Sequence, residues 1–460
     1  MRYDAIVIGA GMAGLAAGLR LALYGKKTLV LERHSRPGGL NSWYRAGGYH
    51  LDVGLHALTN YNPAAGRDAP LNRLLRRLRL SRAALKLAPQ KESWILHYGA
   101  KLVFNNDFAC LLDNAQARFP GAADGLRKLA AEARRHYMED RFFTGESARA
   151  RLPEFIAGPM LREMILMPVM FYGCAAQDDM DWGQFLIIFM SVFEEGLCRP
   201  EGGIRPIIDL LTERLAAAGG ELRLRAGVHR VITSDGAATG VILDNGEVIE
   251  SGAVYSSAGW VETAAMCPEM DPAGETAAGA GAMSFLETIH VLDRPAAQLG
   301  LDASIVFYNN APRFAYRKPE APVDLQSGVV CVAGNFGYET PPPFEQVRVT
   351  HIANPDYWMQ APDAQYHTAK DEWPVRSLAA LPMDLPDFRS AIAFHDTFTP
   401  RTIKKFTGKL NGAVYGAPQK HPDGATPVPG LYVIGTDQGL LGVTGAMIGG
   451  VAVAARTALV

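Results

Sequence analysis

Three glycines near the start of the chain have the spacing of a nucleotide-binding turn. Gly9, Gly11 and Gly14 form a G-x-G-x-x-G pattern between the apolar run 5–8 and a segment rich in alanine and leucine. The pattern predicts a buried strand, a tight turn and a helix. The first glycine permits the bend, the second lets a pyrophosphate approach the backbone, and the third lets the helix pack on the strand. The helix N-terminus offers free N–H groups to the anion.

An acidic side chain follows the next expected strand. The apolar run 28–31 ends at Glu32, about 20 residues beyond the turn, which is the spacing expected of a carboxylate that binds ribose hydroxyls. Because a carboxylate repels a 2′-phosphate, adenosine without that phosphate is the favoured ligand. The alternative is that the glycines belong to an unrelated loop, but the strand, turn and helix around them argue against it.

Two further glycine-rich stretches carry a resemblance to the FAD-dependent amine-oxidase-like superfamily. Gly38 and Gly39 follow shortly after Glu32, and the segment GLYVIGTDQGLLGVTGAMIGG covers 430–450. The resemblance implies FAD as the cofactor, with Asp437 at its ribityl or pyrophosphate portion. It also implies a final helix from about Gly445, whose N-terminus faces the flavin and stabilises charge on it.

A third stretch, 204–259, is similar to the superfamily segment in which the backbone at Val228 meets the adenine ring. It predicts a helix over 204–218, a strand over 228–233 and a hairpin across 244–246. Taken together, the resemblance implies FAD contacts at Gly9, Gly11, Gly14, Glu32, Arg33, Gly38, Gly39, Val228, Gly435, Asp437, Val443, Thr444 and Gly445.

Within the superfamily, the chain most resembles the group of phytoene desaturases, carotenoid isomerases and retinol saturases. The stretches that carry this likeness are LVLERHSRPGGLNSWYRAGGYHLDVGLHALTNY, HDTFTPRTIKKFTGKLNGAVYGAP and the late segment above. The resemblance implies a polyene or other long apolar isoprenoid as substrate. It also places His56 and Tyr415 near the flavin as candidate acid–base residues. A histidine satisfied by backbone hydrogen bonds and a tyrosine that caps the core are the alternatives.

The order of these stretches predicts an interleaved α/β architecture. A Rossmann-like FAD-binding domain with a parallel sheet and a three-stranded antiparallel crossover would take residues 1–83, 201–281 and 401–460. The inserts 84–200 and 282–400 would form an α+β substrate domain. The first insert holds a run of methionine and phenylalanine that is more typical of core than of a ligand channel.

The composition excludes several functions. A formal net charge of −2 and the lack of basic runs with aromatic residues argue against nucleic acid as a partner. The five cysteines have no metal-ligand spacing, so we expect free thiols, no metal and a cytoplasmic location. The segment 70–82 alternates leucine and arginine, which indicates either a helix with a solvated basic face or peripheral contact with an anionic membrane.

Two other functions remain open on the sequence alone. An FAD-dependent amine or amino-acid oxidase would share the fold but would need a compact site with a group that binds the amine or carboxylate. A lipid carrier built on the same fold would be non-catalytic, and Glu32, Gly38, Gly39 and Asp437 argue against it because they serve chiefly to hold FAD. The sequence leaves the oligomeric state, the electron acceptor and the direction of the redox change open.

Overall fold

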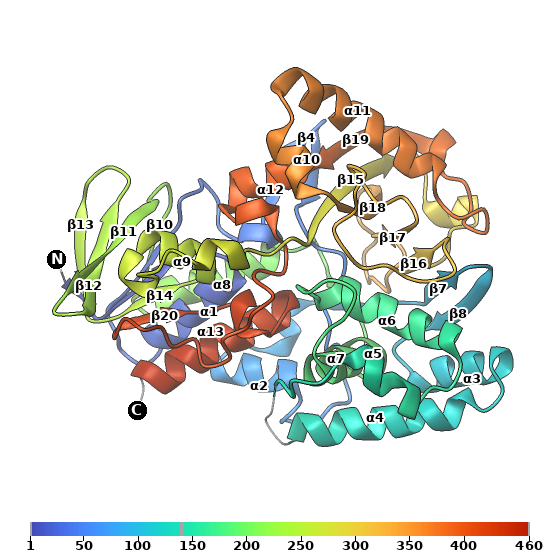
Figure 1. The fold of residues 1–460 in the computed structure, drawn as a ribbon, viewed down its shortest axis with the longest axis horizontal. Helices are drawn as coiled ribbons and strands as arrows, with labels where there is room; N and C mark the ends of the chain where they lie inside the picture. Colours follow the sequence, from blue (N-terminus) through green and yellow to red (C-terminus); the bar gives the residue numbers. More distant parts are fainter. Residues whose placement is uncertain (1, 139–141, 459–460) are drawn as a thin grey trace.

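A five-stranded parallel sheet forms the centre of the lobe that holds both chain termini (Figure 1). The computed structural model describes residues 2–138 and 142–458. All neighbouring strands of this sheet run parallel, which requires crossover connections and buries the strands on both faces. In spatial order the strands are β10 (Glu221–Arg223), β3 (Thr28–Leu31), β2 (Ala5–Ile8), β14 (Val254–Ser256) and β20 (Leu431–Val433).

The helices beside this sheet come from distant parts of the chain. Helix α1 (Met12–Ala22) packs against α8 (Arg205–Ala217) and α13 (Gly442–Ala458). The contact with α13 is close because a Cβ on Gly450 would lie 2.3 Å from the carbonyl oxygen of Ala13. Helix α13 begins at Gly442, earlier than the sequence suggests, because the turn before it is shorter.

An antiparallel meander connects β10 to β14 within the first lobe, which we call the nucleotide lobe. Its strands are β11 (Val228–Ser234), β12 (Ala237–Leu243) and β13 (Val248–Ser251), and the short β1 (Arg2–Tyr3) adds to β13 in parallel. The expected hairpin lies between β12 and β13. The predicted fold class, a parallel sheet with an antiparallel crossover, is therefore confirmed.

The second lobe contains a seven-stranded mixed sheet in which only β16 and β7 pair in parallel. Its strands lie in the two inserts of the sequence, while the limits of the two domains stay a prediction. In spatial order they are β19 (Ile392–Phe398), β15 (Ser284–Leu292), β18 (Glu345–Ala353), β17 (Ser327–Val332), β16 (Ile305–Asn309), β7 (Ser93–His97) and β8 (Ala100–Phe104).

Helices cover this sheet on two sides in Figure 1. Below it lie α3 (Phe108–Arg118), α4 (Ala122–Met138), α6 (Pro159–Gly173) and α7 (Trp182–Phe189), and above it α10 (Pro355–Gln360) and α11 (Asp363–Ala379). Helix α12 (Pro400–Thr407) lies beside the sheet, towards the other lobe. The methionine and phenylalanine run forms α6 and α7 and packs largely in the core, as expected. Among the described residues, no helix is both long and apolar enough to cross a bilayer.

Candidate functional site

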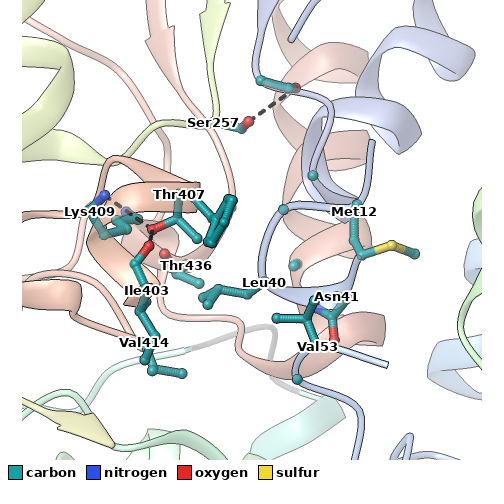
Figure 2. A pocket seen from close by; sticks show the side chains of 18 of the residues that line it. Met12, Leu40, Asn41, Val53, Ser257, Ile403, Thr407, Lys409, Val414 and Thr436 are labelled. Atoms are coloured by element: carbon teal, nitrogen blue, oxygen red, sulfur yellow. Dashed lines mark hydrogen bonds between the residues drawn. The ribbon is translucent and has the colours of Figure 1, made fainter. Parts of the chain in front are cut away.

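A cavity of about 530 Å³ lies between the two lobes. Figure 2 shows Met12, Leu40 and Asn41 on one side, and Thr407, Lys409 and other late residues facing them across the space. The first group follows the early strands β2 and β3, and the second belongs to α12 and the loop after it. This part of the cavity is thus built from segments at the two ends of the chain.

The first glycine turn forms one wall of the cavity. Gly9 has φ +89°, and its N–H donates to the carbonyl of Leu31 at 2.7 Å. A Cβ on Gly14 would lie 1.9 Å from the carbonyl oxygen of Gly9, so glycine is required there for the helix to approach the turn. Gly11 differs because a Cβ there would meet no protein atom within 4 Å. Glycine at this position leaves room in the cavity that a pyrophosphate can occupy.

The N-terminus of α1 opens onto the same space. The N-cap is Gly11, which has no side chain with which to cap the first turn. The next residues, Met12 and Ala13, line the cavity. Uncapped N–H groups at a helix N-terminus favour an anion, so this wall fits the diphosphate of a dinucleotide.

Glu32 and the second glycine pair lie beside this turn. The Glu32 carboxylate accepts hydrogen bonds from the backbone N–H groups of Ala10 and His34, both at 2.8 Å, and lines the cavity at the end of β3. Gly38 donates its N–H to the carbonyl of Ala10 at 2.8 Å and has φ +113°. The two glycine motifs therefore lie side by side and are joined by a backbone hydrogen bond.

The late glycine-rich segment brings Thr436, rather than Asp437, to the cavity. Gly435 and Thr436 line it, whereas the Asp437 side chain is buried behind them. Its carboxylate accepts hydrogen bonds from the N–H groups of Trp260 at 2.6 Å and Ala417 at 2.9 Å. Asp437 therefore holds together three chain segments that surround the cavity.

Two buried lysines balance the charge of Asp437. Lys409 Nζ lies 4.0 Å from Asp437 and 3.6 Å from Glu262, and Lys420 Nζ lies 3.7 Å from Asp437. Burial alone would raise the pKa of Asp437, but the two ammonium groups outweigh it and lower the pKa. Burial lowers the pKa of Lys420 to about 8 in spite of Asp437. Of this cluster, Lys409 and Glu262 reach the cavity wall.

The far end of the cavity is an aromatic chamber. We use this name for the part lined by Phe171 and Tyr172 of α6, Phe285 of β15, Phe307 of β16 and Tyr415. The rings of Phe285 and Tyr415 lie 6.0 Å apart and meet edge to face. The Tyr415 hydroxyl donates to the carbonyl of Phe171, and burial raises its pKa. The chamber therefore offers an apolar ligand a rigid aromatic surface.

Three polar side chains interrupt the aromatic chamber, and we call them the polar wall: His56, Glu287 and Thr350. Glu287 of β15 and Thr350 of β18 are direct cross-strand partners. Glu287 Oε2 lies 3.0 Å from His56 Nε2 and 3.0 Å from the Thr350 hydroxyl. The other carboxylate oxygen pairs with the guanidinium of Arg348. All three side chains of the polar wall line the cavity.

The geometry separates the predicted site residues into two sets. Those that line the cavity are Gly9, Gly11, Glu32, Arg33, Gly38, Gly39, His56, Val228, Tyr415, Gly435 and Val443. Those that do not line it are Gly14, Asp437, Thr444 and Gly445; of these, Gly445 lines a smaller neighbouring pocket. The sequence reasoning missed Glu287, Thr350, Lys409 and Thr436. Glu287 and Thr350 could have been noticed as polar residues inside apolar, β-branched runs.

Searches for similar proteins give a consistent result. The profile of a family described as flavin containing amine oxidoreductase matches residues 12–258. A prolycopene isomerase of Daucus carota is 22% identical over 94% of this chain and 76% of its own length. A neurosporene-forming phytoene desaturase of Rhodobacter capsulatus is 26% identical over 55% of this chain and 52% of its own.

A shorter match is more similar in sequence. An all-trans-retinol 13,14-reductase of Danio rerio is 46% identical over 63 residues, which is 13% of this chain and 10% of that protein. Among solved structures, an oxidoreductase from Methanosarcina mazei has a TM-score of 0.69 at 20% identity and covers 98% of this chain and 99% of its own. A putrescine oxidase bound to putrescine has a TM-score of 0.64 at 17% identity, with 99% of each chain covered. These structures establish the fold.

Proposed function

Because this chain belongs to the flavin-containing amine oxidoreductase family and takes FAD as its cofactor, we propose that its substrate is a polyene or another long apolar isoprenoid. The observation that carries the proposal is the aromatic chamber, which is continuous with the glycine-built part of the cavity. The similarity to a prolycopene isomerase over 94% of this chain supports the same substrate class. The reaction would be a desaturation, a saturation or a double-bond isomerisation.

We propose that the glycine-built part of the cavity holds the cofactor. Glu32 would bind the ribose hydroxyls, Gly11 and the N-terminus of α1 the diphosphate, and Val228 the adenine. The N-terminus of α13 would face the flavin ring, because Gly442 and Val443 line the cavity next to the aromatic chamber. Asp437 would act indirectly, by holding the surrounding segments in place.

Bound FAD supplies a donor and acceptor of hydride beside the chamber. The chain's own contribution is to exclude water, to hold the rod-like substrate in one orientation, and to move a proton. We propose His56 for the proton because its ring lines the cavity. Tyr415 is the second candidate, but its hydroxyl already donates to the carbonyl of Phe171, which favours a role in shaping the chamber.

An amine is the competing substrate class, and Glu287 is the observation that bears on it. A carboxylate among aromatic rings is a suitable site for an ammonium group. However, Arg348 is fully buried against Glu287 and cancels its charge. A second cation would enter a chamber with no net negative charge, so desolvation would outweigh the attraction. The polar wall therefore favours a neutral substrate.

The test is turnover of defined probes by the purified holoenzyme. Prolycopene, phytoene and all-trans-retinol are each incubated with oxidised and with reduced enzyme, and products are separated by chromatography. Putrescine serves as the amine probe. Conversion of one of the three polyene probes is the expected result. Oxidation of putrescine alone would move the assignment to an amine oxidase, and binding of a polyene without conversion would favour a lipid carrier.

We propose that any contact with a membrane is electrostatic and runs through α2 (Pro70–Arg77). Its leucines Leu71, Leu74 and Leu75 are buried in the core of the nucleotide lobe, so they do not insert into a bilayer. Arg76 of the helix is exposed, and so is Arg79 just after it. The helix thus presents charge to anionic headgroups but no apolar anchor.

A further inference from the structure

The polar wall determines which nitrogen of His56 carries a proton. Glu287 is ionised: burial alone would raise its pKa, but Arg348 and His56 outweigh burial and lower it to about 2. An ionised carboxylate only accepts hydrogen bonds. The Thr350 hydroxyl donates its hydrogen to Glu287 at 3.0 Å. Towards His56 Nε2, at 3.1 Å, the same hydroxyl can therefore only accept a hydrogen bond. Both neighbours of Nε2 are therefore acceptors, and Nε2 must be the protonated nitrogen.

The other ring nitrogen is left to the cavity. Within 2–138 and 142–458, the structure shows no hydrogen bond to His56 Nδ1, and the side chain keeps 17% of its surface exposed. With the proton on Nε2, the neutral imidazole has its lone pair on Nδ1. His56 thus presents a proton acceptor to whatever occupies the aromatic chamber.

The backbone of His56 is fixed as firmly as its ring. Arg199 of β9 (Cys198–Pro200) donates to the carbonyls of Leu55 at 2.6 Å and His56 at 2.7 Å. Arg348 donates to the carbonyl of Asp52 at 2.9 Å from the other side. Two buried guanidinium groups therefore hold the segment that carries His56, while Glu287 and Thr350 hold the ring itself.

We infer that Glu287 is a positioning residue that fixes His56 with Nε2 protonated, so that Nδ1 exchanges the substrate proton. The inference rests on the proposed function. In the desaturating direction, one substrate carbon loses a hydride to FAD and its neighbour loses a proton to Nδ1. The electron pair of the second C–H bond becomes the new double bond. The imidazolium that results lies against the Glu287 carboxylate, and the reverse reaction returns the proton from Nδ1.

The tautomer is measured directly by nitrogen NMR of holoenzyme labelled at histidine, with His56→Gln to assign the signal. We expect Nε2 to be protonated in the unaltered protein. In Glu287→Gln the amide can either donate or accept, so we expect a mixture of tautomers. Protonation at Nδ1 in the unaltered protein, or an unchanged tautomer in the variant, would overturn the inference. This readout does not depend on turnover.

The second readout is the pH dependence of one turnover with the polyene converted in the test above. The charged and titratable groups around His56 are Glu287, Arg348, Arg199 and Cys331, and burial raises the pKa of the Cys331 thiol to about 11, so it stays neutral. Loss of the Glu287 charge disfavours the imidazolium. In Glu287→Gln, we expect the part of the pH–rate profile that rises with pH to move about one pH unit to lower pH. We also expect the rate of the turnover to fall by about 100-fold.

Two companion variants keep the test decisive. Glu287→Gln leaves the Arg348 guanidinium without its carboxylate partner, and the single variant can fail to fold for that reason. The double variant Glu287→Gln with Arg348→Met removes both charges and replaces the single variant in that case. Thr350→Val removes a hydroxyl from the same wall and leaves the charges in place, so the pH–rate profile should stay where it is. An equal shift of the pH–rate profile in Thr350→Val would mean that Glu287 acts only by maintaining the structure of the polar wall. If the unaltered enzyme converts none of the polyene probes, that result counts against the proposed function. It leaves the tautomer of His56, which is measured without turnover, untouched.

Discussion

The two ends of the cavity are built from different parts of the polypeptide. At the end proposed to hold FAD, which we call the cofactor end, the glycine turns at Gly9 and Gly38 and the N-terminus of α1 contribute backbone to the wall. At the end proposed to hold the substrate, which we call the substrate end, the wall is made of side chains from strands β15, β16 and β18 and helix α6. A backbone wall suits a cofactor that is always the same, whereas a wall of side chains can be changed to suit a different substrate.

At the cofactor end, the buried Asp437 side chain supports the backbone wall. Replacing it with alanine leaves Lys409 and Lys420 buried without their shared carboxylate. We expect Asp437→Ala to lose about 3–5 kcal/mol of unfolding free energy, measured by urea denaturation. Asp437→Asn keeps an acceptor for one of the two N–H groups, that of Trp260 or that of Ala417, and should lose less. Equal losses would mean that the charge of Asp437 contributes little.

The substrate end should be sensitive to acid because it contains a buried ion pair. The pKa of Glu287 is depressed to about 2 from a usual value of 4.5. Its stabilising contribution is therefore complete above pH 4.5 and is lost as the pH falls towards 2, for a total of about 3 kcal/mol. Urea unfolding in small pH steps measures it. The loss should be smaller in Glu287→Gln with Arg348→Met, and an identical profile would contradict the assignment of the charge.

Two glycines of the same turn should respond differently to a methyl group. In Gly14→Ala the Cβ would lie 1.9 Å from a carbonyl oxygen, so the helix must shift. We expect a loss of about 1–3 kcal/mol in stability. In Gly11→Ala the Cβ meets no protein atom and enters the cavity instead. The stability of the FAD-free protein should then be unchanged while FAD affinity falls.

Calorimetric titration of FAD into each FAD-free variant, together with thermal unfolding, separates the two effects. A Gly11→Ala variant that binds FAD as tightly as the unaltered protein would remove Gly11 from the cofactor site.

The smallest expected effect lies outside both ends of the cavity, at α2. Arg76 is exposed on its basic side. If anionic headgroups bind there, Arg76→Gln should weaken binding to vesicles that contain phosphatidylserine by about 1 kcal/mol. Sedimentation with vesicles measures this, and vesicles of phosphatidylcholine alone are the control. Equal binding of both proteins to anionic vesicles would place any contact elsewhere.

The contrast between the two ends also explains how far the sequence could be interpreted. The cofactor end depends on local patterns, because a glycine turn and its helix are consecutive in the chain, so Gly9, Gly11 and Glu32 could be found from spacing. The substrate end depends on strand pairing. Glu287 and Thr350 are neighbours only because β15 and β18 pair in one register, and a shift of one residue would turn both away from the cavity.

Turns limit prediction even at the cofactor end. The late G-T-D triplet brings Thr436 to the cavity and turns Asp437 into the protein, and α13 begins at Gly442 rather than near Gly445. These one- to three-residue differences depend on local dihedral angles, such as φ +99° at Gly435. A sequence motif places the segment, but not the side chain within it that faces the ligand.

The packing of α1 on α13 has a consequence for folding during synthesis on the ribosome. Helix α1 ends at Ala22 and α13 begins at Gly442, so at about 5–20 residues per second tens of seconds pass between their synthesis. Until α13 emerges, the apolar surface of α1 that it will cover stays open to other nascent chains and to chaperones. The nucleotide lobe is therefore the first part of the molecule to be synthesised and the last to complete its packing.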